Sequence, residues 1–119
     1  MALRLNYNFF TFILNKFFFI KWSFKKIFPI IIQEILTKNI LMFAWINNYN
    51  LLKIFSIFLL YYYSRSKFKF WFKGLSSYNF QSFKYFYIDC DMDCGLFKII
   101  QFNNKSCHTN NNSCFFNKL

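Results

Sequence analysis

The segment from Ile40 to Tyr63 constrains the fold more than any other part of the chain. This window of 24 residues holds twelve Leu, Ile and Phe side chains, which is close to the length and apolar content of a membrane-spanning helix. On a membrane-insertion scale the twelve contribute roughly −4 to −7 kcal/mol, whereas Lys53 near the middle costs about +3 kcal/mol. Three Tyr and several basic residues border the window, as at a membrane interface. We therefore predict one marginal transmembrane helix over residues 40–63.

The composition makes a dense water-soluble core harder to build. The chain has 21 Phe but only two Ala, two Gly and no Val, whereas a close-packed core alternates large and small side chains. Phe, Ile, Lys, Asn and Tyr make up 70 of the 119 residues, which indicates AT-rich DNA. The scarcity of acids, four in all, is typical of a frame without a selected product. A dubious AT-rich reading frame therefore stands beside the membrane interpretation.

Composition divides the chain into three regions. Residues 1–63 form an apolar, membrane-associated region, residues 64–102 a basic aromatic region, and residues 103–119 a tail rich in Asn and Cys. A second apolar stretch, Phe9 to Ile32, is interrupted by four Lys and one Pro, so we predict no second span there. No small-residue cleavage site follows the first apolar run, so no cleaved signal peptide is expected.

In the basic aromatic region, residues 64–102, charged and aromatic side chains alternate along part of the sequence. Between Arg65 and Lys73 cations alternate with Phe, which predicts a strand. Turn residues precede Phe80 to Ile88, and Gly95 precedes Leu96 to Phe102, so a small antiparallel β-meander is expected. We therefore predict no compact fold. The apolar N-terminal half would be helical with one transmembrane helix, the meander would follow it, and the C-terminal tail would be disordered.

Three aspartates alternate in the run Asp-Cys-Asp-Met-Asp-Cys-Gly. Asp89, Asp91 and Asp93 match the first three ligand positions of a calcium-binding loop. Position 6 of such a loop is a turn glycine and is Cys94 here, and position 12 is a bidentate Glu and is Ile100 here. We therefore expect an acidic turn between strands and no calcium site.

Five side chains of zinc-ligating type occur late in the chain: Cys90, Cys94, Cys107, His108 and Cys114. The first two cysteines have a spacing that zinc sites use, but the others do not. Two disulfides are equally open, with three possible connectivities. A Cys–His pair for nucleophilic catalysis is not indicated, because neighbours in sequence are not thereby aligned in space. We predict no metal-ligating, cofactor-binding or catalytic residues.

The resulting prediction for function is a small membrane-associated protein without enzymatic activity. It would be a single-pass protein with membrane lipid as its partner and no small-molecule substrate, since the sequence has one His, four acids and no phosphate-binding or nucleophile-elbow motif.

The alternative is a basic protein that binds nucleic acid weakly and without sequence preference. The net charge of +11 favours polyanions, and interleaved cations and aromatic rings are what single-stranded nucleic acid binding uses. The residues in question are Lys67, Lys69, Lys73, Phe70, Trp71 and Phe72.

Overall fold

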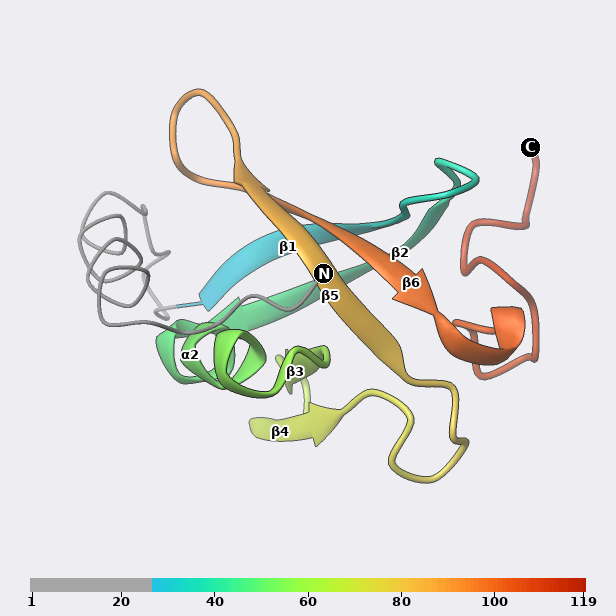
Figure 1. Cartoon of the computed structure of the whole chain (residues 1–119), viewed down its shortest axis with the longest axis horizontal. Coiled ribbons are helices and arrows are strands. Elements are labelled where there is room, and N and C mark those ends of the chain that lie inside the picture. The colour runs from blue at the N-terminus through green and yellow to red at the C-terminus, as the bar shows by residue number, and fades with distance from the viewer. Residues whose placement is uncertain (1–26) are drawn as a thin grey trace.

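The computed structural model describes residues 27–119 (Figure 1). Its elements are β1 (Ile27–Glu34), β2 (Ile40–Asn47), α2 (Asn48–Ile57), β3 (Tyr61–Ser64), β4 (Lys69–Phe72), β5 (Gln81–Ile88), β6 (Gly95–Gln101) and the short 3₁₀ helix η1 (Phe102–Asn104). Four strands form a sheet in the order β2-β1-β6-β5, and β3 pairs with β4 in a second sheet. β1 and β6 run parallel, whereas the other neighbours are antiparallel. The described chain is therefore a compact β-rich fold.

Aromatic rings pack the core on one face of the larger sheet. The ring of Phe97 lies 4.4 Å from that of Phe86 and 5.7 Å from that of Phe83, measured between centroids. Phe55 of α2 reaches Phe83 at 5.2 Å. Offset and edge-to-face contacts of this kind fill space without small residues. Gly95 is needed for this packing, because a Cβ there would lie 2.6 Å from Phe86 Cε2.

The prediction of a transmembrane helix over residues 40–63 is wrong, because this window contains β2, α2 and β3. Its Asn residues begin the helix: the Asn47 side chain accepts from the Asn50 backbone N–H, and the Asn50 side chain accepts from the Asn47 N–H, which satisfies amides at the helix start. Lys53 is exposed while Leu51 and Ile54 are buried. Within residues 27–119, no helix combines the length and apolar character that crossing a membrane requires.

The predicted helical N-terminal half and the β-meander also need correction. Residues 27–34 form a mostly buried strand in place of a helix, as a run of Ile and Phe permits. Two of the three predicted strands lie at β5 and β6, but the strand predicted between Arg65 and Lys73 forms β4 and pairs with β3, so no three-stranded meander forms. The stretch before Ile27, including most of Phe9 to Ile32, lies outside the described residues.

The C-terminal tail is ordered against β2, contrary to the prediction of disorder. Ser113 Oγ donates to the carbonyl of Ile40 at 2.7 Å, and the Cys114 N–H donates to that of Leu41 at 2.7 Å. Ser106, which is 4% exposed, also donates its hydroxyl to Leu41 O. Because β2 is an edge strand, the tail satisfies backbone groups that would otherwise face solvent.

A buried chain of polar groups connects the core to this tail. The Tyr62 hydroxyl donates to Gln81 Oε1, and Gln81 Nε2 donates to Gln101 Oε1 at 3.1 Å. The Gln101 backbone N–H donates to a Glu34 carboxylate oxygen at 3.0 Å, and its side chain donates to Asn112 O at 3.2 Å. Buried polar groups that are satisfied in this way specify one arrangement of the surrounding chain.

Candidate functional site

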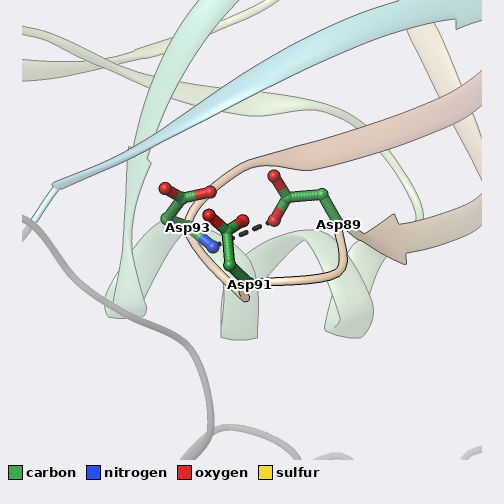
Figure 2. Close-up of side chains that lie close together, drawn as sticks. All are labelled: Asp89, Asp91 and Asp93. Carbon is green, nitrogen blue, oxygen red and sulfur yellow. Dashed lines mark hydrogen bonds between the residues drawn. The ribbon is translucent and has the colours of Figure 1, made fainter.

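The turn between β5 and β6 brings three carboxylates together (Figure 2). Asp89, Asp91 and Asp93 each offer an oxygen that lies within 4.8 Å of the others, and all three residues are exposed. Asp89 Oδ1 accepts from the backbone N–H groups of Asp93 at 3.0 Å and Cys94 at 3.1 Å. Met92 takes a positive φ of 64°, which lets the turn close. The turn itself therefore makes alternate side chains converge.

The carboxylates perturb one another strongly. Hydrogen bonding with Asp91 and then Asp89, together with desolvation and the nearby negative charges, raises the pKa of Asp93 to about 6. Desolvation opposes ionisation of Asp89, but hydrogen bonds from the Cys94 and Asp93 backbones outweigh it, so the pKa of Asp89 is lowered. Without a cation Asp93 thus keeps its proton to a higher pH than an ordinary aspartate does.

A second cluster is formed by two thiols of the tail and the ammonium group of Lys73, which directly follows β4. The buried Lys73 donates from Nζ to Ser106 O. Burial lowers the pKa of Lys73, while Cys114 and Cys107 oppose this shift. The Thr109 hydroxyl donates to Cys107 Sγ at 3.0 Å and lowers the pKa of Cys107, and Cys114 and Lys73 lower it further. Partial desolvation and then the Cys107 charge raise the pKa of Cys114. One thiolate is therefore favoured over two.

The four cysteines do not gather in one place. Cys90 and Cys94 belong to the turn before β6, whereas Cys107 and Cys114 follow its far end (Figure 1). Seven strand residues span roughly 20 Å. Two thiols are fewer than the three or four protein ligands that a zinc site takes, and within residues 27–119 only the aspartates form a group of three close ligands. The described part of one chain does not complete a zinc site.

The basic and aromatic residues between Arg65 and Lys73 were interpreted as a nucleic-acid surface, but they do not form one face. Lys67 and Lys69 are exposed, whereas Lys73 is 8% exposed and turned toward the tail. Trp71 packs on the buried Tyr62, with ring centroids 4.9 Å apart. Sequence reasoning missed the burial of Lys73, since its partner Ser106 lies 33 residues later in the chain and leaves no local signal.

Together the features of residues 27–119 define a class: a compact β-rich domain with one short α-helix and three carboxylates that converge in one turn. A family model described as phosphoribosyl-AMP cyclohydrolase matches residues 42–116. The phosphoribosyl-AMP cyclohydrolase of Acidovorax sp. (strain JS42) is 42% identical over 103 residues, covering 84% of this chain and 78% of that protein. That of Burkholderia vietnamiensis (strain G4) is 40% identical over 100 residues, covering 84% and 72%. The chain belongs to the phosphoribosyl-AMP cyclohydrolase family.

Family membership corrects the functional prediction made from sequence. The relatives are enzymes, named for a small-molecule substrate. This overturns the interpretation of a membrane-associated protein without activity, with lipid as its partner and no small-molecule substrate. It equally overturns the alternative of a nucleic-acid-associated protein and that of a product without function. The small number of acids had indicated a frame without a selected product, but three of the four acids lie together in one turn.

Proposed function

We propose that this chain hydrolyses phosphoribosyl-AMP, with a hard divalent cation held by Asp89, Asp91 and Asp93. The observation that carries the proposal is the convergence of these carboxylates within 4.8 Å in a member of this family. The proposal departs from the prediction, made from sequence, that the chain has no metal-ligating residues.

The spacing of the carboxylates fits a single cation. Oxygens bound to one cation at about 2.1–2.5 Å lie roughly 3 Å apart when adjacent and up to about 5 Å apart when opposite. The observed limit of 4.8 Å falls in this range. Carboxylate oxygens suit Mg²⁺, Mn²⁺ or Ca²⁺. A bound cation would also take the place of the proton that hydrogen bonds with Asp91 and Asp89, and then their negative charges, favour on Asp93.

The chain's own residues would position the cation and attract the substrate. The two backbone N–H groups that hold Asp89 fix its orientation before any ligand arrives, as preorganised sites require. When bound, the cation supplies Lewis acidity and activates water near neutral pH. The excess of 11 positive charges draws a phosphorylated nucleotide toward the molecule.

A cyclohydrolase opens a ring by adding water. In phosphoribosyl-AMP the ring with electron-poor C=N carbons is the purine. Addition of water oxygen to such a carbon, followed by cleavage of its ring C–N bond and transfer of a proton to the departing nitrogen, gives a product heavier than the substrate by one water molecule.

The test is to incubate the purified full chain with phosphoribosyl-AMP and identify the product by mass spectrometry. We expect a product one water heavier, formed with Mg²⁺ or Mn²⁺, not formed after chelation, and formed again when the cation is restored. Intact substrate under every metal condition, from protein whose circular dichroism shows it to be folded, would refute the proposal.

A further inference from the structure

Two cysteines of the tail, Cys107 and Cys114, are brought together by the loop that joins them. Both ends of this loop are anchored to the same backbone carbonyl, because the Ser106 hydroxyl and the Cys114 N–H donate to Leu41 O at 3.3 and 2.7 Å. Within the loop the Asn110 N–H donates to Cys107 O at 3.0 Å, which closes a turn. The shared anchor therefore keeps the two cysteines side by side.

The two sulfurs are hydrogen-bonding partners. The Cys114 thiol donates to Cys107 Sγ, and the Thr109 hydroxyl donates to the same sulfur at 3.0 Å. Both cysteines are free thiols. Sulfurs that share a hydrogen bond need only a small further approach to reach the S–S bond length of about 2 Å.

The surroundings favour a thiolate at Cys107 and a protonated thiol at Cys114. Hydrogen bonds from the side chain and backbone of Thr109 lower the pKa of Cys107 against the effect of desolvation, and Cys114 and the Lys73 charge lower it further. Desolvation and then the Cys107 charge raise the pKa of Cys114. A nucleophilic sulfur beside a second, resolving thiol is the arrangement found in peroxide-sensitive proteins.

The pair is also within reach of solvent. Cys107 is 8% exposed, but residues 108–112 and Cys114 are exposed, so an oxidant as small as hydrogen peroxide can reach its sulfur. The other two cysteines, Cys90 and Cys94, lie in the acidic turn, where desolvation and then the negative charges of Asp89 and Asp93 raise the pKa of Cys94. The acidic turn therefore disfavours a thiolate, and its cysteines serve as an internal control.

We propose that Cys107 and Cys114 are a peroxide-oxidisable thiol pair that closes to an intrachain disulfide. The Cys107 sulfur attacks one oxygen of hydrogen peroxide, so an S–O bond forms, the O–O bond breaks and hydroxide leaves. The Cys114 sulfur then attacks the sulfur of this sulfenic acid: an S–S bond forms, the S–O bond breaks, and the oxygen leaves with the thiol proton as water. In total the chain loses two hydrogen atoms, and one peroxide becomes two molecules of water. The inference is separate from the proposed hydrolysis, because it rests on none of the residues at the acidic turn.

The test is to treat the reduced full chain with hydrogen peroxide, alkylate the remaining thiols with iodoacetamide and digest with trypsin. Cleavage after lysine leaves Cys107 and Cys114 in one peptide, residues 106–118, and Cys90 and Cys94 in another, residues 85–98. We expect the first peptide to be unalkylated and lighter than its dithiol form by two hydrogen atoms, and the second to be alkylated at both cysteines. Alkylation of both tail cysteines, a disulfide between two chains, or oxidation of both peptides at the same rate would overturn the proposal.

Variants at the exposed Thr109 test which sulfur attacks peroxide. Thr109→Val removes the hydroxyl that donates to Cys107 and should slow disulfide formation about threefold, because about tenfold less thiolate is only partly offset by its greater nucleophilicity. Thr109→Ser keeps the hydroxyl and should react at the wild-type rate. In Cys114→Ser the sulfenic acid on Cys107 should persist and be trapped by dimedone. Equal rates in Thr109→Val and wild type, or no trapped sulfenic acid on Cys107, would overturn the assignment of Cys107 as the attacking sulfur.

Discussion

The affinity of the acidic turn for a cation should depend on pH because the cation competes with the proton on Asp93. Interactions with Asp91 and Asp89 raise the pKa of Asp93 from 3.8 to about 6. For the metal-free fold, a raised carboxyl pKa contributes stability below about pH 4 that is lost as the pH rises through about 6. A cation must displace this proton, so its apparent affinity falls in acid. With a pKa of about 6, the dissociation constant should be about tenfold larger at pH 5 than at pH 7.

Electron paramagnetic resonance of free Mn²⁺ measures this directly at pH 5, 6 and 7. The control is Asp93→Asn, which removes the titrating carboxyl and should bind Mn²⁺ more weakly but with little change between these pH values. Equal affinity of the wild-type chain at pH 5 and pH 7 would refute the reasoning. A tenfold change that persists in Asp93→Asn would show that another group carries the proton.

Two further predictions concern the fold. Gly95→Ala should lower the free energy of unfolding by about 1–3 kcal/mol, measured in urea, because the new methyl would lie 2.6 Å from a Phe86 ring carbon; a loss below about 0.5 kcal/mol would show that the ring moves freely. Tyr62→Phe should cost about 1–3 kcal/mol because it removes the hydroxyl that donates to the buried Gln81. The same change at the exposed Tyr85 should alter stability by less than about 0.5 kcal/mol, and equal losses at both positions would contradict the role given to this hydrogen bond.

The strands that sequence analysis placed best are those that follow turn residues. β5 and β6 were predicted from the turn residues before Phe80 and from Gly95, which is the first residue of β6, so local patterns were sufficient. The apolar window from Ile40 to Tyr63 carried no such pattern, since an apolar run is compatible with a buried strand or a helix. In the fold, Asn47 and Asn50 of this window form the cap at the start of α2.

Order in the tail could not be predicted for a different reason. Ser106 and Ser113 hold it through backbone carbonyls 65 to 73 residues earlier in the chain, and no local signal encodes contacts at that separation. The three aspartates were recognised as a group, but were compared only with a twelve-residue calcium loop. Their convergence depends on the short turn between β5 and β6, and that turn needs none of the later loop positions.

The central claim is that Asp89, Asp91 and Asp93 hold the catalytic cation. Its most direct test compares the turnover numbers of two separate variants, Asp91→Asn and Met92→Asn, with phosphoribosyl-AMP at saturating Mg²⁺. Met92 lies in the same turn with a positive φ that Asn tolerates, and its side chain is not a cation ligand, so this variant should retain wild-type turnover. Asp91→Asn removes a ligand charge and should lower turnover about 100-fold or more, the equivalent of several kcal/mol of transition-state stabilisation. Wild-type turnover in folded Asp91→Asn would contradict the assignment of the catalytic cation to this turn.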